Sequence, residues 1–112
     1  MQDCIFCKIA AGEIPCKQVY EDNNVLAFYD INPRAPVHIL MIPKAHASSG
    51  AADISADNSA VIGQCFEAAA KIACALNITD FRMVTNNGAL AGQTVHHLHF
   101  HLLAGRELTT MG

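Results

Sequence analysis

Three histidines alternate with apolar residues near the end of the chain, in the stretch His97-Leu98-His99-Phe100-His101-Leu102-Leu103. Successive side chains of an extended strand leave on opposite faces. The alternation therefore predicts a strand over residues 97–103, with three imidazoles on one face and three apolar groups on the other. The apolar face needs a core to pack against, which leaves the imidazole face for chemistry.

The size and composition of the chain indicate one compact unit with a partner. A length of 112 residues is that of one domain, so we expect a single domain over residues 1–112. Hydrophobic residues make up 52% and charged residues 15%, which predicts apolar surface covered by a second copy in a homodimer. The net charge is -3 and the lysines and arginines are scattered, so no extended basic track for nucleic acid is expected.

The ends and the cysteines indicate a reducing, non-membrane setting. Residues 1–4 have neither a basic region nor a long apolar run, and no segment approaches the roughly 20 apolar residues of a membrane span. We therefore expect a cytoplasmic protein without membrane contact. Five cysteines are an odd number, and a disulfide framework is not expected in that compartment.

The first half of the chain predicts a short helix followed by strands. Residues 4–12 contain helix formers closed by a glycine. Residues 17–21 and 25–30 have strand character on either side of turn residues, which predicts a hairpin. After a proline-rich break, the nearly continuous apolar run 37–42 predicts a central strand.

The second half predicts one long helix and then strands. Residues 47–57 form a loop with a helix cap at Ser55 or Asp57, and apolar residues recur at helical spacing over 59–76. A strand over 81–85 and a glycine loop over 86–93 then lead into the histidines. This order predicts an α+β fold, in which one mainly antiparallel sheet is covered on one side by the long helix.

The histidines and the loop before them are candidates for phosphate chemistry. Crowded imidazoles make each other harder to protonate, so at least one is expected to stay neutral and nucleophilic near pH 7. Gly92-Gln93-Thr94 offers backbone N–H groups and a hydroxyl to an anionic oxygen, or is only a turn. Asp30 and Asn86 are turn residues or ligand contacts, with Asp30 an acceptor for a sugar diol.

Cys4 and Cys7 have the spacing of a metal site or a redox disulfide, and they are alternatively buried cysteines without a ligand. A redox pair belongs at a strand-to-helix turn, which the position of Cys4 near the start of the chain disfavours. Tetrahedral zinc requires two further ligands. His46 and one histidine of the alternating stretch are the best candidates.

Residues 97–103 match the His-φ-His-φ-His-φ-φ signature of the histidine triad (HIT) superfamily, in which φ is an apolar residue. Almost the whole chain resembles the histidine triad nucleotide-binding (Hint) branch, of the bacterial zinc-containing type. The further stretches that carry this resemblance are Cys4-Ile5-Phe6-Cys7-Lys8-Ile9, Glu13-Ile14-Pro15, Asp30-Ile31-Asn32-Pro33, Ala35-Pro36-Val37-His38 and Ile42-Pro43-Lys44-x-His46.

The resemblance implies a fold and an activity. The fold is a HIT-like five-stranded antiparallel sheet with one long helix and a short N-terminal helix, in a homodimer whose two sheets join into one. The activity is hydrolysis of purine nucleoside phosphoramidates, or related nucleotidyl substrates, at the α-phosphorus. By the family's pattern, His99 attacks the phosphorus and forms a nucleotidyl-histidine intermediate that water resolves. His101 binds phosphate oxygens, and the backbone carbonyl of His97 orients the ring of His99.

The resemblance also implies the residues that bind the nucleotide and the metal. Thr94 contacts the scissile group, where the family usually has serine, while Asp30 accepts from the ribose hydroxyls and Asn86 contacts the sugar-phosphate side. The base pocket is lined by Ile5, Phe6, Ile9, Phe28 and Ile31. Structural zinc is held by Cys4, Cys7, His46 and His97, and no organic cofactor is expected.

Two other classes of function remain open from the sequence. In one, the chain is a nucleotide-sensing or protein-interaction module whose catalysis is vestigial. In the other, His97, His99 and His101 are ligands of a catalytic metal.

Overall fold

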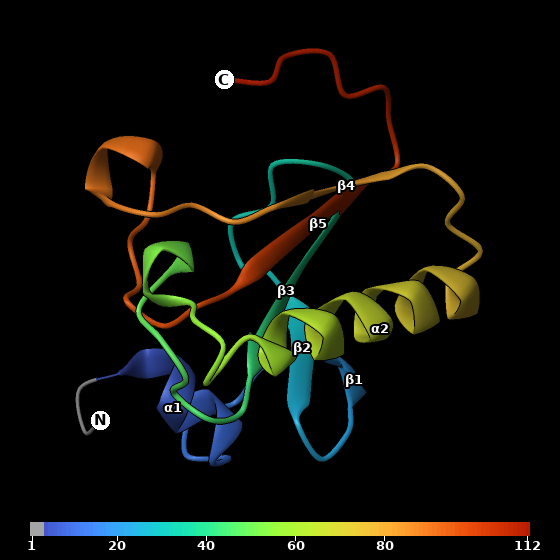
Figure 1. The fold of residues 1–112 in the computed structure, drawn as a ribbon. Helices are drawn as coiled ribbons and strands as arrows, with labels where there is room; N and C mark the ends of the chain where they lie inside the picture. Colours follow the sequence, from blue (N-terminus) through green and yellow to red (C-terminus); the bar gives the residue numbers. More distant parts are fainter. Residues whose placement is uncertain (1–3) are drawn as a thin grey trace.

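The computed structural model describes residues 4–112 and contains a five-stranded antiparallel sheet in the order β1-β2-β3-β5-β4 (Figure 1). The elements are α1 (Ile5–Ala10), β1 (Gln18–Glu21), β2 (Val25–Tyr29), β3 (Val37–Pro43), η1 (Ala51–Asp53), α2 (Ala60–Ala75), β4 (Phe81–Val84), η2 (Ala89–Ala91) and β5 (Phe100–Ala104). The predicted α+β class, the hairpin and the central position of β3 are confirmed.

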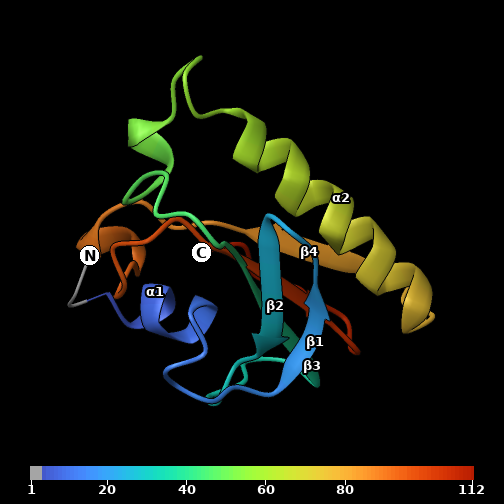
Figure 2. The same cartoon turned by 90° about the horizontal axis from the view of Figure 1, so that it is seen from below.

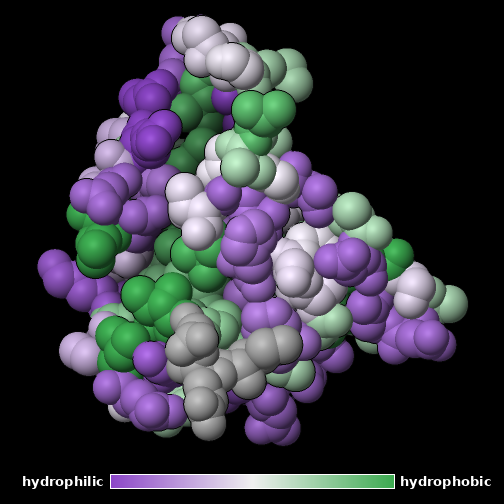
Figure 3. Space-filling view, turned by 90° about the vertical axis from the view of Figure 1, so that its left-hand side faces the viewer, coloured by the Kyte–Doolittle hydropathy of each residue, from purple (hydrophilic) through white to green (hydrophobic). Residues whose placement is uncertain are grey.

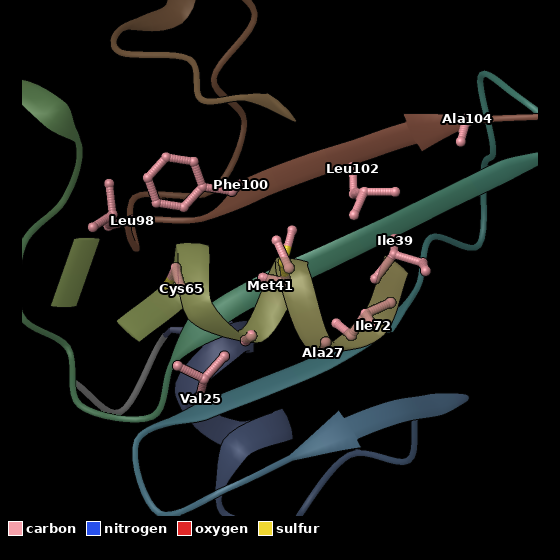
Figure 4. Packing of buried hydrophobic residues seen from close by; sticks show 12 residues of the cluster. Val25, Ala27, Ile39, Met41, Cys65, Ile72, Leu98, Phe100, Leu102 and Ala104 are labelled. Carbon is pink, nitrogen blue, oxygen red and sulfur yellow. The ribbon is translucent and has the colours of Figure 1, made fainter. Parts of the chain in front are cut away.

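The two faces of the sheet are covered by different helices (Figure 2). Side chains alternate along β2 and β3, so Val25, Ile39 and Met41 point toward α2 and join the larger core cluster, shown in Figure 4. Residues of the opposite parity, such as Leu26 and Leu40, form a second cluster with α1. The histidine site lies on this second face.

The predicted strand over 97–103 is wrong in its first half, because β5 begins at Phe100. The backbone of residues 97–99 does not pair with β3. Instead the Leu98 N–H donates to the carbonyl of Ser48 at 2.9 Å. The alternation of side chains nevertheless survives, since Leu98, Phe100 and Leu102 all lie in the core cluster beneath α2.

The predicted cap of the long helix at Ser55 or Asp57 is also wrong, because α2 begins at Ala60 with Ser59 as its N-cap. The hydroxyl of Ser55 instead accepts from the Asp57 N–H at 3.3 Å, within a turn that precedes the helix. The predicted end of the helical spacing at residue 76 agrees with the structure, in which Asn77 has the left-handed φ of 57° that ends many helices.

The surface shows no membrane-spanning element among the residues described. Within 4–112, no helix is both long enough and apolar enough to cross a bilayer.

The face that carries α1 and the nearby loops shows hydrophobic patches between hydrophilic groups (Figure 3). Residues 1–3, on which the expectation of no targeting segment partly depends, lie outside the described part of the chain.

Candidate active site and metal centre

Cys4, Cys7, His46 and His97 form one cluster of four side chains. One ligand atom from each lies within 4.8 Å of the others. The Nδ1 atom of His97 is 3.3 Å from Sγ of Cys4 and 3.5 Å from Sγ of Cys7, and Nδ1 of His46 is 3.3 Å from Sγ of Cys7. Cys4 is the N-cap of α1, and its Sγ accepts from the Cys7 N–H at 3.3 Å, which holds the two cysteines together at the start of the helix.

The cluster fits a tetrahedral zinc ion. Zinc bonds of about 2.3 Å to sulfur and 2.0 Å to nitrogen separate the two kinds of ligand atom by about 3.5 Å. The observed separations match this spacing. Two thiolates and two imidazoles are also a set that zinc prefers, and they leave no position for a substrate, which is the pattern of a structural site.

The ring of His97 is oriented for this role by the backbone. Its side chain is fully buried, and its Nε2 lies 2.8 Å from the carbonyl oxygen of Pro43. A carbonyl accepts only, so Nε2 carries the proton and Nδ1 presents its lone pair to the cysteines. Burial, and then the neighbouring His46 and His99, lower the pKa of His97, which keeps the imidazole neutral as a ligand requires.

The backbone of the same residue orients His99. Nδ1 of His99 lies 2.7 Å from the carbonyl oxygen of His97 and therefore carries the proton it donates. Burial lowers the pKa of His99, so the ring is neutral at pH 7 and Nε2 has a free lone pair. Nε2 of His99 has no hydrogen-bond partner within residues 4–112. Every fully buried side-chain nitrogen in that part of the chain has such a partner, so Nε2 of His99 must be accessible at the surface.

His101 is held in the opposite protonation state at its outer nitrogen. Nδ1 of His38 accepts from the backbone N–H of Arg34 at 3.0 Å, so a neutral His38 carries its proton on Nε2. That Nε2 donates to Nδ1 of His101 at 2.9 Å. Nε2 of His101 must then bear the proton, and it is a donor beside the lone pair of His99, whose ring centroid is 5.1 Å away.

His38 and His101 form a relay of two hydrogen-bonded imidazoles, and burial explains why both of them are neutral. Desolvation lowers the pKa of His38. Desolvation, followed by the neighbouring His99 and His38, lowers the pKa of His101 to about 4. Oδ2 of Asp30 lies 3.4 Å from Nε2 of His38, and its charge raises the pKa of His38, but burial outweighs it.

Asp30, His38 and His101 also form a group with the composition of a metal site. The hydrogen bond from the Arg34 N–H argues for a proton relay instead, because it places the lone pair of His38 on the nitrogen that faces away from His101. The structure also gives no support to the hypothesis that His97, His99 and His101 bind a catalytic metal. Within residues 4–112 these three do not form a group of close ligand atoms, since His97 and His99 each turn a ring nitrogen to a backbone carbonyl.

An open cavity of about 710 Å³ borders the relay. Four of the residues predicted to act on substrate line it: Asp30, Asn86, Thr94 and His101. The same wall includes Arg34, Arg82 and the last residues of the chain. His99 is not part of that lining and lies beside His101, 5% exposed.

The predicted base-pocket residues are only partly together. Phe6 and Phe28 are buried and pack edge to face at 5.9 Å, Ile9 packs on the same cluster, and the ring of Phe6 lies 5.0 Å from that of His99. Ile5 and Ile31 are 45% and 91% exposed. None of the five lines the 710 Å³ cavity.

His38 is the one functional candidate that the sequence reasoning missed. It interrupts the apolar run of β3, where it was interpreted as part of a core strand. A histidine inside an otherwise apolar strand indicates a buried polar group that needs a hydrogen-bond partner. In the structure His38 is indeed only 4% exposed. The carbonyl of Pro43 could not have been identified in this way, since a backbone group has no letter in the sequence, and the carbonyl of His97 was expected only from the family resemblance.

Comparison with known proteins places the chain in a class and then in a family. The fold and site define a small α+β protein with a histidine centre, and the HIT domain matches residues 11–108, so the chain belongs to the HIT family. It is 50% identical over 109 residues to an uncharacterized HIT-like protein of Synechocystis sp., covering 96% of this chain and 95% of that protein. It is 45% identical over 104 residues to protein HitA of Neisseria gonorrhoeae, covering 92% and 96%.

Solved structures give the same result. A HIT family hydrolase from Clostridium thermocellum aligns with a TM-score of 0.94 and 43% identity over 99% of this chain and 97% of that one. A histidine triad protein from Clostridium difficile aligns with a TM-score of 0.94 and 46% identity, covering 100% and 98%.

Replacing Cys7 tests the metal centre. Cys7→Ser removes a ligand at the centre of the cluster and is expected to lower bound zinc from about one ion per chain to near zero, with loss of thermal stability. Elemental analysis and thermal denaturation measure both effects. Cys74→Ser is the matched control, because Cys74 is an exposed free thiol. Full zinc content in Cys7→Ser would contradict the assignment.

The partly buried imidazole of His101 predicts a pH-dependent stability. Its folded pKa of about 4 lies below the ordinary value of 6.5, so between these pH values the unfolded chain binds a proton that the folded chain does not. The free energy of unfolding should therefore fall as the pH is lowered from 6.5 to 4. Each unit of pKa difference is worth about 1.4 kcal/mol.

Denaturant unfolding at a series of pH values measures this slope. His101→Gln should make the slope less steep, although His38, His97 and His99 still contribute to it, while the exposed His96→Gln should leave it unchanged. Equal slopes in wild type and His101→Gln would show that His101 is not held neutral by the fold.

Proposed function

We propose that this protein is a nucleotide-binding hydrolase of the histidine triad nucleotide-binding branch, which cleaves purine nucleoside phosphoramidates or related nucleotidyl substrates. The observation that carries the proposal is the difference between two neighbouring ring nitrogens. Nε2 of His99 has a lone pair, and Nε2 of His101 has a proton. A displacement at phosphorus requires this pair, one atom to attack and one to stabilise the charge on the phosphate oxygens.

The proposed reaction has two steps. Nε2 of His99 bonds to the α-phosphorus while the P–N bond to the leaving amine breaks, and the amine takes up a proton from solvent. The phosphorylated ring is cationic, and the carbonyl of His97 stabilises the Nδ1–H that carries part of the charge. A water oxygen then bonds to phosphorus, its proton passes to solvent and the Nε2–P bond breaks, which releases the nucleoside monophosphate and restores the neutral imidazole.

The cavity residues receive their roles within the same proposal. His101 and Thr94 bind oxygens of the phosphate, Asn86 contacts the sugar-phosphate side and Asp30 accepts from the ribose hydroxyls. The base packs near Ile5, Phe6, Ile9, Phe28 and Ile31. Zinc at the four-residue cluster is structural and supplies no chemistry to the reaction, and the chain acts as one HIT domain in the cytoplasm.

Two relatives support this assignment. The Clostridium thermocellum protein, 43% identical, is a HIT family hydrolase. A histidine triad nucleotide-binding protein from Candida albicans is 30% identical, with a TM-score of 0.79 over 98% of this chain.

Replacing the nucleophile separates catalysis from binding. His99→Asn should lower kcat on an adenosine phosphoramidate by about 10⁴-fold or more, while the affinity for AMP stays within about tenfold, because a nucleophile acts in the transition state more than in the ground state. Steady-state kinetics and calorimetry measure the two quantities. His96→Asn is the matched control, since His96 is exposed and next to the triad.

Three measurements, on His99→Asn, on wild type and on wild type after chelation, distinguish the enzyme from the other two functions. Undiminished turnover by His99→Asn would reject the proposed mechanism. If wild type binds AMP but turns over no phosphoramidate, the chain is a sensing or interaction module. Retained wild-type turnover after exhaustive chelation would exclude a catalytic metal at the triad.

The proposal includes a homodimer that joins two sheets at their β4 edges. β4 is the edge strand at one end of the sheet, and Phe81 on it is 40% exposed. Two apolar side chains of the α2 region are also exposed, Leu76 at 40% and Phe66 at 49%. An exposed apolar edge of this kind is usually covered.

Sedimentation equilibrium tests the dimer directly. Wild type should have the mass of two 12.0 kDa chains at micromolar concentration, and Phe81→Arg should shift it to one chain. Gln18→Arg, on the edge strand at the other end of the sheet, should remain dimeric. A monomeric wild type would contradict this part of the proposal.

A further inference from the structure

Gln93 is a buried polar side chain in the loop that leads to Thr94. It is 7% exposed, and both ends of its amide are engaged by the protein. Oε1 accepts from the N–H of Gly88 at 2.8 Å, while Nε2 donates to the carbonyls of Ser49 at 2.6 Å and Val95 at 3.1 Å. An amide bonded in this way has no N–H left for a phosphate.

The backbone of Gln93 is engaged as well. Its N–H donates to the carbonyl of Gly88 at 3.1 Å, so the same two residues are joined by a backbone bond and by a side-chain bond. Gly88 and Gly92 have φ values of 93° and 101°, which side chains rarely tolerate. The loop from 88 to 93 is thus closed twice by one glutamine.

A second set of contacts joins this loop to the segment 48–52, which follows the metal ligand His46. Oδ1 of Asn87 accepts from the Ala52 N–H at 2.9 Å. A Cβ on Gly50 would lie 2.6 Å from Oδ1 of Asn87 and 3.4 Å from Nε2 of Gln93. A side chain at position 50 would therefore have to displace the side chain of Asn87, which accepts from the Ala52 N–H.

The geometry points to Gln93 as a positioning residue rather than a nucleotide ligand. Its amide joins the loop 88–95 to the segment 48–52 and so fixes where Thr94 faces the cavity. This inference rests on the proposed function, in which Thr94 contacts the substrate. Groups that stabilise developing charge are effective only when they are held in place beforehand, and a displacement of about 1 Å costs about 10²-fold in rate.

Gln93→Met keeps the length of the side chain and removes the hydrogen bonds at both ends of the amide, which together form the tie between the loop 88–95 and the segment 48–52. We expect kcat on an adenosine phosphoramidate to fall about 10- to 100-fold, while the affinity for adenosine changes less than about threefold. Adenosine is the probe because it lacks the phosphate that the loop residues face. Gln18→Met, on the exposed strand β1, is the matched control and should keep wild-type kinetics.

A double variant tests whether Gln93 acts through Thr94. If it does, adding Gln93→Met to Thr94→Ala should lower kcat less than about threefold further, because the group that Gln93 positions is already absent. Multiplication of the two single losses would overturn the inference. An equal loss in adenosine affinity and in kcat would also overturn it, since it would make Gln93 a direct ligand.

Gly50→Ala provides a variant that removes no hydrogen-bonding group, and it keeps the inference testable if Gln93→Met does not fold. Its Cβ should displace the side chain of Asn87, which joins the loop to the segment 48–52, and so lower kcat about threefold or more. Wild-type kcat in Gly50→Ala would contradict the close contact on which the tie depends.

Amide hydrogen exchange separates this inference from the proposed function, because it needs no turnover. In Gln93→Met, or in Gly50→Ala, the Gly88 amide should exchange at least about tenfold faster, while amides of the central strand β3 keep their wild-type rates. Unchanged exchange at Gly88 would reject the tie even in an active enzyme. Faster exchange in a protein that hydrolyses no phosphoramidate would retain the tie and reject the activity.

Discussion

One buried residue, His97, connects the two centres of this protein. Its Nε2–H donates to the carbonyl of Pro43, which turns Nδ1 toward Cys4 and Cys7, and its own carbonyl accepts from Nδ1–H of His99. The candidate metal cluster and the proposed nucleophile are therefore positioned by the side chain and the backbone of the same residue. Because His97 is fully buried, neither contact can relax into solvent. A small chain gains a rigid site in this way without adding a structural element.

Protonation along the sheet surface follows from backbone contacts of the same kind. The Arg34 N–H determines which nitrogen of His38 is protonated, and His38 in turn determines it for His101. The carbonyl of His97 does the same for His99. Two chemically identical rings thereby present different outer nitrogens, although burial lowers the pKa of both. The difference comes from fixed backbone dipoles, which cost no reorganisation during a reaction.

The sequence predicted the parts of this site that depend on spacing. Alternation around Leu98 and Phe100 separated core from chemistry correctly, and Cys4 with Cys7 predicted a cluster that the fold completes. The strand was nevertheless extended too far, because period-two alternation does not reveal that residues 97–99 bond to a loop instead of a strand. His38 was missed because it lies within an apolar run, and the engaged amide of Gln93 was not foreseen because its partners are backbone groups. Contacts to the backbone depend on the fold and leave no pattern in the sequence.

The central claim is that Nε2 of His99 is the free nucleophile because its Nδ1 proton is held by the carbonyl of His97. Rapid acid-free quenching of wild type with an adenosine phosphoramidate, followed by peptide mapping and ³¹P NMR of the trapped adduct, identifies both the residue and the ring nitrogen that carry the phosphorus. The account predicts adenylate on Nε2 of His99. An adduct on Nδ1, on another residue, or no adduct in a protein that is turning over substrate would contradict it.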